Sequence, residues 1–253
     1  MSNSQSYKST QIIRKQFELS DKIGDICDNI YRGININKIR GNGMKGIECV
    51  QDEVLDLTVV VPTYNPDKKL SEKINSLLKR GFHDIIVVND GSDEKYMKIF
   101  DEVEDNSTVI HCRKNKGRAM KVAFSFCSKY RKKSNGVIVV DFAYSYHPDD
   151  VYACGKALFE NRGHLILGCR DFRDGKISLV RRVENNIKKK VYSIFGGIKV
   201  SDTGAGVCAI GMSLVHEIVE IKGEYQDYEC NILLETKKMS LPITEVTIRM
   251  LSA

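Results

Sequence analysis

The 253-residue sequence contains no apolar run of about 18 residues, so it has no candidate membrane-spanning helix. Residues 1–10 are polar and lack the apolar segment of a signal peptide. None of the eight cysteines forms a Cys-x-x-Cys pair, which argues against a structural zinc site. The net charge is only +6 and no zinc-finger or RNP-like string occurs, so we expect no nucleic-acid partner. These absences predict a cytoplasmic protein with reduced thiols.

What the sequence does contain is the composition of a globular protein, with 42% hydrophobic and 28% charged residues. A chain of this length can bury a large core without metal ions or disulfides. Its basic residues cluster at positions 129–133 and 181–190. A phosphate or anionic-lipid partner is one explanation of such clusters, and a solvated helix face is the other.

Residues 1–56 differ in pattern from the rest of the chain. Apolar residues recur there at helical spacing, which predicts an amphipathic helix that begins at Thr10 and ends at Gly33. A glycine-rich polar stretch at 41–46 indicates a linker. The helix packs on the main domain, packs on a second copy of the chain in a homo-oligomer, or lies on a membrane surface. Its polar face mixes acids and bases, which weakens the membrane interpretation.

From residue 57 onward, short apolar runs alternate with helical patterns, which predicts an α/β domain with a mostly parallel sheet flanked by helices. The predicted strands are 57–61, 84–88, 108–111, 136–140 and 198–200, and the predicted helices are 67–80, 94–104, 117–130 and 228–236. Pro62 is expected to end the first strand, and Asn65 to cap a helix that Pro66 opens. We therefore expect one domain over residues 57–253, preceded by an N-terminal helical arm.

Polar residues stand at three of the predicted strand ends. They are the segments 62–65 (Pro-Thr-Tyr-Asn) and 89–92 (Asn-Asp-Gly-Ser), and Asp141. The carboxyl ends of parallel strands meet at one edge of a sheet, where ligands bind in such folds. The three ends are therefore expected to converge on one crevice.

These strand ends, in this order, resemble the motifs of the family 2 glycosyltransferases, which have the GT-A fold. The closest resemblance is to the polyprenyl-phosphate hexosyltransferases of the dolichol-phosphate mannose synthase type, and it runs from Leu57 to Leu234. The matching strings are VVVPTYN (59–65), VVNDGS (87–92), NKGRA (115–119), GCRDF (168–172), SDTGAG (201–206) and DYECN (227–231). Each string is weak alone, but six in order are a specific signal.

The resemblance implies an inverting hexosyltransferase of cell-envelope glycan synthesis. Such an enzyme moves a hexose from a UDP- or GDP-linked sugar to a polyprenyl phosphate or a related acceptor. The implied donor-binding residues are Pro62, Tyr64, Asn65, Asp90, Lys116 and Asp141. By chemistry alone, the Asp90 carboxylate can hold a nucleobase edge or a ribose, and Lys116 can hold a phosphate. A tight turn is the structural alternative for the segment around Asp90.

The resemblance also implies a catalytic pair and an acceptor-phosphate site. These are Asp202 and Glu229, and Arg170, Arg182 and Asn185, respectively. Arginine forks match the geometry of phosphate. Because a polyprenyl phosphate is already anionic, Asp202 is expected chiefly to orient groups rather than to remove a proton. A helix cap remains the alternative role for Asp202, and a core salt bridge for Glu229.

A divalent metal, magnesium or manganese, is the cofactor that the resemblance implies, held by an Asp-X-Asp element on the donor diphosphate. Asp141 matches the first acid. The downstream His147 fixes the alignment, so Ala143 occupies the position of the second acid and Ser145 that of a glutamine. Two expected ligands are missing, by natural divergence or by an engineered change at Ala143. We therefore predict weak metal dependence, with His147 as either a substitute ligand or a structural residue.

These departures leave two functions open. One is an active glycosyltransferase, and the alternative is a weakened or inactive pseudo-glycosyltransferase that binds a nucleotide or a protein partner. A sugar nucleotidyltransferase shares the architecture but needs a Gly-x-Gly-Thr-Arg loop, which the sequence lacks. The chain ends at Ala253 without an anchor segment. We therefore expect a peripheral protein at the cytoplasmic face of the membrane, or a truncated catalytic domain.

Overall fold

The structure, a computed structural model, describes residues 53–112, 119–143, 146–172, 179–204, 206–221 and 226–249. The chain divides into two units, Met1–Glu48 and Cys49–Ala253, and every described residue belongs to the second unit. The predicted N-terminal helix and its linker therefore lie outside the described residues. The proposed domain boundary after residue 56 stays a prediction.

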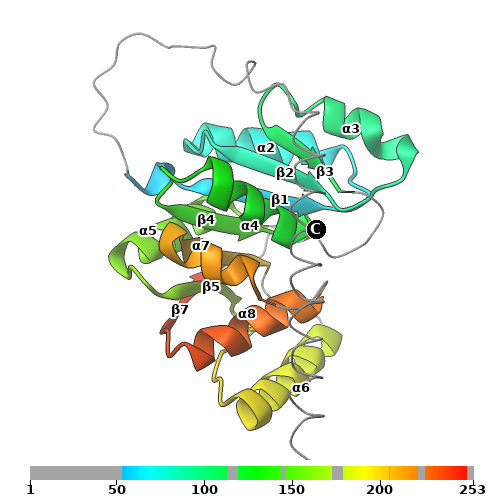
Figure 1. The fold of residues 1–253 in the computed structure, drawn as a ribbon. Helices are drawn as coiled ribbons and strands as arrows, with labels where there is room; N and C mark the ends of the chain where they lie inside the picture. Colours follow the sequence, from blue (N-terminus) through cyan, green and yellow to red (C-terminus); the bar gives the residue numbers. More distant parts are fainter. Residues whose placement is uncertain are drawn as a thin grey trace, which may run out of the picture. The chain divides into compact units, whose positions relative to one another are not determined.

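A seven-stranded, mostly parallel sheet forms the centre of the described unit (Figure 1). In spatial order its strands are β3 (Thr108–His111), β2 (Ile85–Asn89), β1 (Thr58–Thr63), β4 (Gly136–Val140), β6 (Val207–Gly211), β5 (Leu165–Arg170) and β7 (Ile243–Ile248). Strand β6 is antiparallel to both of its neighbours, whereas the other pairings are parallel. Within this sheet, β6 therefore runs against all the other strands.

Helices cover the sheet, as the α/β prediction required. They are α2 (Lys69–Arg80), α3 (Met97–Asp101), α4 (Ala119–Tyr130), α5 (Pro148–Glu160), α6 (Leu179–Gly196), α7 (Met212–Val219) and α8 (Gln226–Lys238), with 3-10 turns η2 (Glu53–Leu55) and η3 (Glu94–Tyr96). Helix α4 packs on α7, in front of the sheet in Figure 1, and α2 packs on α5. None of the helices in the described ranges is both long and apolar enough to cross a membrane.

Strand β1 is buried on both of its faces, which explains its run of valines. Val59, Val60 and Val61 have no exposed surface. Successive side chains of a strand point to opposite faces. Val59 and Val61 accordingly belong to the core cluster of α2 and α5, and Val60 points to the face that α4 covers. A parallel strand covered on both faces is continuously apolar rather than alternating.

The hydrophobic core begins before the first strand. Val54 in η2 is buried and belongs to the same core cluster as β1. Gly155 of α5 allows this contact, because a Cβ at that position would lie 3.0 Å from Val54 Cγ1 and 2.9 Å from Leu57 Cδ1. Helix α5 thus approaches η2 more closely than a larger residue would permit.

Most of the predicted elements are confirmed. The predicted strands at 108–111 and 136–140 coincide with β3 and β4 at both ends. The predicted helix at 94–104 is wrong in length and partly in type. It begins as the 3-10 turn η3, a common form for the first turn of a helix, and its α-helical part α3 ends at Asp101.

The predicted end of the first strand at residue 61 is wrong, because β1 continues through Pro62 to Thr63. Val59 N donates to Asp84 O (2.8 Å), which places the backbone groups of Val59 on the β2 side. Backbone groups alternate sides along a parallel strand. The missing N–H of Pro62 therefore faces the β4 side, where pairing with β1 ends at Val60. Pro62 costs no ladder hydrogen bond at this position.

The predicted strand at 198–200 is wrong. Ile198 and Val200 are buried, but this segment pairs with none of the seven strands. Ile198 N instead donates to Tyr192 O (3.1 Å), and Gly197 adopts a left-handed φ of +61°. Both features are typical of a chain leaving the end of a helix. The apolar side chains reflect burial after α6, not sheet pairing.

Candidate active site

One edge of the sheet collects the carboxyl ends of the parallel strands and also the start of the reversed strand β6. Asp141, the first residue after β4, donates its N–H to the carbonyl oxygen of Gly206, the residue before β6 (2.7 Å). Two loops far apart in sequence are joined there. Ligands bind at this edge in open α/β sheets, and the described members of the predicted donor set lie along it.

Asn65 connects the loops that follow β1 and β2. Its N–H donates to Ser92 Oγ (2.8 Å), and its Oδ1 accepts from Asp93 N (3.1 Å). The backbone of Asn65 is left-handed, with φ +47°, a conformation that asparagine tolerates better than most residues. Asn65 therefore fixes the relative position of two of the three predicted strand ends.

The predicted capping role of Asn65 is wrong. Helix α2 begins at Lys69 rather than at Pro66. Asp67 Oδ1 accepts from Lys69 N (2.9 Å) and so satisfies a free amide of the first turn. The Asn-Pro pair was expected to mark a helix start, but the Asn65 side chain accepts a hydrogen bond from the loop after β2 instead.

The remaining predicted donor residues are only partly described. Asp90 is half-buried directly after β2, and its N–H donates to Thr63 O (2.9 Å). Tyr64 is partly exposed directly after β1, a position at which an aromatic ring can form a wall for a flat ligand. Pro62 lies in β1 itself. Lys116 lies outside the described residues.

Asp141 has a basic neighbour that the sequence did not reveal. Lys73 of α2 donates through Nζ to the carbonyl oxygen of Phe142, and the same ammonium lies 4.3 Å from the centre of the Phe142 ring. Lys73 and Asp141 attract each other electrostatically, and each therefore affects the pKa of the other. A positive charge thus stands beside the retained acid of the Asp-X-Asp element.

Burial is the main influence on both groups. It raises the pKa of Asp141, while a hydrogen bond from Ala143 N (2.8 Å) and the Lys73 charge act in the opposite direction. Burial also lowers the pKa of Lys73, against the attraction of Asp67 and Asp141. The low-polarity surroundings strengthen the mutual attraction of the two charges.

The described residues at Asp141 do not fit a divalent cation held in the Asp-X-Asp manner. Asp141 Oδ1 already accepts from the N–H of Ala143, which has no oxygen to offer in place of the second acid. Lys73 adds a positive charge at the same place, which opposes a second cation. Across the described ranges, no three His, Cys, Asp or Glu side chains gather as a metal-binding group.

His147 is placed as a structural residue rather than as a ligand. It is the N-cap of α5, and its Nδ1 accepts from Asp149 N (3.3 Å). The neighbouring Asp150 accepts from Arg249 N and Nε, both at 3.0 Å. The His-Pro-x-Asp string thus fastens the start of α5 to the end of β7.

Arg170 and Asp202 form a buried, two-pronged ion pair. Arg170 Nε donates to Asp202 Oδ2 (2.6 Å), and Arg170 Nη2 donates to Oδ1 (2.8 Å). Each carboxylate oxygen also accepts one backbone N–H, from Arg170 (3.0 Å) and from Gly204 (3.1 Å). With two hydrogen bonds on each oxygen, Asp202 is held as a fixed anion rather than as a free proton acceptor.

Two further side chains hold the loop that carries Asp202. Asn185 Oδ1 accepts from Thr203 N and Oγ1, both at 3.1 Å, and Asn185 Nδ2 donates to Ser201 O (3.0 Å). Glu245 of β7 accepts from Ser201 N and from Ser201 Oγ. The loop is therefore tied to α6 and β7 as well as to β5. Glu245 belongs to no sequence motif of the site, since only the fold brings it to this loop.

The Arg170–Asp202 pair lies between two cavities. Asp202 lines a narrow cavity of about 70 Å³ together with Asp141. Arg170 lines a larger cavity of about 500 Å³, to which Arg182 and Lys189 also contribute. The predicted acceptor residues Arg170, Arg182 and Asn185 are thus brought to one cavity beside Asp202. The side chain of Glu229, on α8, lies outside the described residues.

Comparison with known proteins agrees with this fold. Glycosyl transferase family 2 matches residues 58–219. The match covers more than half of the chain, and the chain therefore belongs to this family of glycosyltransferases. The predicted GT-A-like α/β fold is confirmed, with its seven-stranded sheet and flanking helices.

Among curated proteins, the chain is 27% identical over 210 residues to the uncharacterized protein MJ1222 of Methanocaldococcus jannaschii, covering 80% of this chain and 83% of that protein. It is 22% identical over 212 residues to a UDP-N-acetylglucosamine–dolichyl-phosphate N-acetylglucosaminyltransferase of Methanococcus voltae, covering 76% of this chain and 84% of that enzyme.

Similar solved structures include mannosyl-3-phosphoglycerate synthase from Rubrobacter xylanophilus, with a TM-score of 0.59 and 19% identity over 76% of this chain and 65% of that one. Another is glucosyl-3-phosphoglycerate synthase from Mycobacterium tuberculosis, in complex with Mn²⁺, UDP and phosphoglyceric acid. Its TM-score is 0.55, with 16% identity over 78% of this chain and 71% of that one. At these identities the likeness concerns the fold.

Proposed function

We propose that this chain is an inverting glycosyltransferase that moves a hexose or N-acetylhexosamine from a nucleotide sugar to a polyprenyl phosphate. The observation that carries the proposal is the cavity of about 500 Å³ beside Asp202, which is lined by Arg170, Arg182 and Lys189. Basic side chains in a cavity of this size suit a phosphate monoester. The curated relative named for a dolichyl-phosphate acceptor supports the same acceptor chemistry.

The proposed roles differ for the two arginines of the cavity. Two guanidinium nitrogens of Arg170 are already bonded to Asp202, so Arg170 serves mainly to position that carboxylate. Arg182 and Lys189 then supply most of the positive charge that meets the acceptor phosphate. The Asn185 side chain is bonded to the Asp202 loop on both sides, and its proposed role is to position that loop.

In the proposed reaction, an anionic oxygen of the acceptor phosphate attacks the anomeric carbon of the sugar. The bond from that carbon to the nucleoside diphosphate breaks, and its electron pair leaves with the diphosphate. The product is a sugar phosphodiester of inverted configuration, and no proton has to be removed. A fully hydrogen-bonded Asp202 suits this chemistry, because it holds Arg170 and the neighbouring loop in position without acting as a base.

The donor is proposed to bind along the ends of β1, β2 and β4. Tyr64 and Pro62 would border the nucleobase, and Asp90 would accept from the base or ribose. Because the described residues at Asp141 do not fit a divalent cation held in the Asp-X-Asp manner, the charge of the diphosphate is proposed to be met mainly by Lys116 and by backbone N–H groups. Glu229 is also proposed to line the donor side of the site.

The test uses the full chain with UDP- and GDP-linked sugars and a short-chain polyprenyl phosphate in detergent. Nucleoside diphosphate release and the mass of the lipid product are measured, with and without manganese. A lipid phosphodiester should form, and the matched polyprenol without phosphate should give none. Equal use of the polyprenol would contradict the acceptor assignment. Donor binding without any transfer would support the pseudo-glycosyltransferase alternative instead.

A further inference from the structure

Helix α6 carries most of the large apolar side chains that remain exposed in the described part of the chain. Six such side chains are exposed, and four belong to α6: Leu179 (77%), Val183 (58%), Ile187 (59%) and Ile194 (74%). Single exposed apolar residues are normal on a protein surface, whereas a group on one element marks an interaction site.

The four residues share one face of the helix. At about 100° of rotation per residue, they fall within an arc of about 80°. We call these four residues the α6 stripe. Asn185 and Tyr192, which are buried, lie on the opposite side of α6. The helix therefore packs on the domain through one face and presents an apolar stripe on the other.

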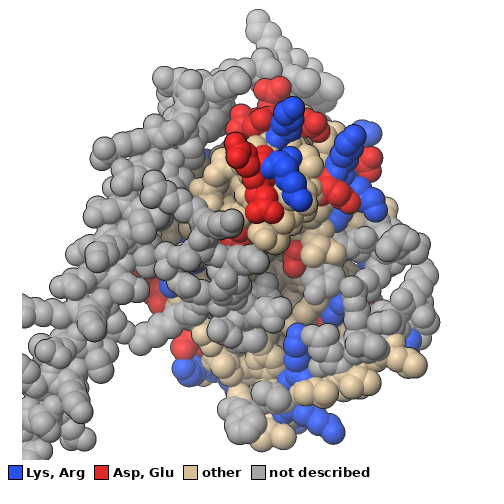
Figure 2. All heavy atoms as spheres, turned by 90° about the vertical axis from the view of Figure 1, so that its right-hand side faces the viewer, with Lys and Arg blue, Asp and Glu red and all other residues tan. Residues whose placement is uncertain are grey.

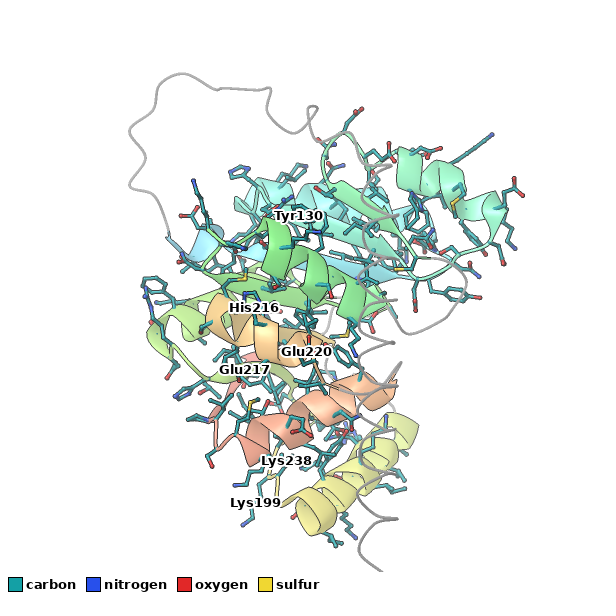
Figure 3. All side chains as sticks on the ribbon, in the orientation of Figure 1. Tyr130, Lys199, His216, Glu217, Glu220 and Lys238 are labelled. Carbon is teal, nitrogen blue, oxygen red and sulfur yellow. The ribbon has the colours of Figure 1, made fainter. Side chains whose placement is uncertain are left out.

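The charge around the α6 stripe has one dominant sign. Helix α6 contains five basic residues and a single acid, Glu184. Lys190 falls within the arc of the stripe and is exposed, and a lysine there can extend its ammonium past an apolar surface. Figure 2 shows basic side chains beside uncharged surface in its lower part, at the level of α6. Lys199 follows the helix and is also exposed (Figure 3).

The α6 stripe adjoins the acceptor cavity. Arg182, Asn186 and Lys189 line that cavity, and they occupy the flank of α6 between its buried face and the stripe. A surface that covers the stripe would thus lie next to the mouth of the cavity. A phosphate in the cavity could belong to a molecule whose apolar part lies in that surface.

We propose that the α6 stripe docks on an anionic lipid bilayer, with its side chains entering the headgroup–acyl boundary and the flanking lysines and arginines contacting lipid phosphates. An apolar stripe with basic flanks is the pattern of an interfacial helix. The proposal rests on the proposed function only for its biological purpose, because docking brings the cavity to a membrane-held acceptor. The docking itself needs no polyprenyl phosphate.

The charge balance favours this occupant over two others. The predicted helix at 10–32 of this chain carries four acids and four bases, so it offers no net charge to a basic face. A second copy of α6 would bring the same excess of positive charge and repel. An anionic bilayer supplies both an apolar interior and negative charge.

The test is co-sedimentation of the full chain with phosphatidylglycerol vesicles and with phosphatidylcholine vesicles, neither containing polyprenyl phosphate. The stripe variant replaces all four residues by serine. The matched control is Tyr130→Ser, because Tyr130 is also exposed but lies on α4, far from α6 in Figure 3. A second variant, Ile194→Glu, changes one highly exposed position and tests docking even if the fourfold variant does not fold.

The wild-type chain and Tyr130→Ser should bind phosphatidylglycerol vesicles, more weakly at high salt, and bind phosphatidylcholine vesicles poorly. Ile194→Glu and the folded stripe variant should bind the anionic vesicles at least roughly tenfold more weakly. Equal binding by all forms, no binding by the wild type, or a dimer that Ile194→Glu dissociates would overturn the proposal. Transfer to polyprenyl phosphate is measured separately in detergent. Docking can therefore fail while transfer is observed, and transfer can fail while docking is observed.

Discussion

Arg170 bonds both carboxylate oxygens of Asp202 with its guanidinium and one of them again with its own backbone N–H. Both side chains are almost fully buried, so the pair is a rigid part of the domain and also a wall shared by two cavities. The position of Asp202 is thus set by the last residue of β5. Changes to either residue should affect stability and function together.

Asp202→Asn should lower the free energy of unfolding by about 3–5 kcal/mol, because Arg170 would be left buried without its anion. Arg170→Met should be similarly harmful. The double variant should lose less than the sum of the two, since it buries no unpaired charge. Urea unfolding followed by circular dichroism measures the wild type, the two single variants and the double variant. Strictly additive losses would show that the pair is not coupled. Transfer should fall in every variant.

Arg182→Ala should raise the KM for polyprenyl phosphate roughly tenfold and leave the KM for the nucleotide sugar nearly unchanged, because a charge-assisted hydrogen bond to the acceptor is lost. Lys199→Ala is the matched control, since Lys199 is exposed nearby but does not line the cavity. An equal rise in both KM values for Arg182→Ala would argue against an acceptor-specific role.

Donor binding to the wild-type chain should depend weakly on manganese. Ala143→Asp should strengthen manganese-dependent donor binding, because it restores a second carboxylate beside Asp141. Calorimetric titration of the donor, with manganese and with chelator, measures both forms. A large manganese effect that is the same in both forms would contradict this account and would point to ligands outside the pair.

Lys73→Met should increase manganese affinity further in the Ala143→Asp background, because it removes the positive charge beside Asp141. The affinities are expected to rise from the wild type to Ala143→Asp to the double variant. Lys69→Met, one turn earlier on α2 and exposed, is the control and should change little. If both lysine variants behave alike, a general change of surface charge explains the effect.

Three buried thiols should resist alkylation in the folded chain. Burial raises the pKa values of Cys127, Cys154 and Cys169 to about 12, so the reactive thiolate is scarce at pH 8. Peptide mass spectrometry after iodoacetamide treatment should find them modified only after unfolding in urea. Rapid modification without urea would show that the core opens readily.

The same thiols predict how stability changes with pH. The unfolded chain loses thiol protons from about pH 8.5 upward, whereas the folded chain keeps them to a higher pH. The folded state therefore binds more protons in this range, and the free energy of unfolding should fall as the pH rises above about 8.5. Urea midpoints measured between pH 8 and pH 10 test the direction, and a rising midpoint would contradict it.

The sequence predicted the sheet well where apolar runs are short and have clear ends. Strand β4 is a run of four valine and isoleucine residues between Gly136 and Asp141, and its predicted bounds are confirmed. The segment at 198–200 (Ile-Lys-Val) also has buried β-branched residues, at Ile198 and Val200, but no strand partner. Apolar residues in a sequence indicate that a segment is buried. Whether the segment forms a strand also depends on which other backbone lies beside it, and a single sequence does not show this.

The sequence also indicated most of the candidate site but not how its members are connected. The resemblance implied different roles for Arg170 and Asp202. They are 32 residues apart in the sequence, and only the arrangement of β5 and β6 makes them partners. Lys73 and Glu245 belong to no motif of the site. They reach it through the packing of α2 and the position of β7, so neither residue could be recognised before the fold was known.

The reversed strand β6 separates two groups of parallel strands, because it pairs antiparallel with β4 on one side and with β5 on the other. The described residues of the predicted donor set lie on the β1–β2–β4 side, and the predicted acceptor residues lie on β5 and α6. A segment spanning β5, α6 and the Asp202 loop could therefore be exchanged between relatives as a cassette, giving a new acceptor while the nucleotide sugar stays the same.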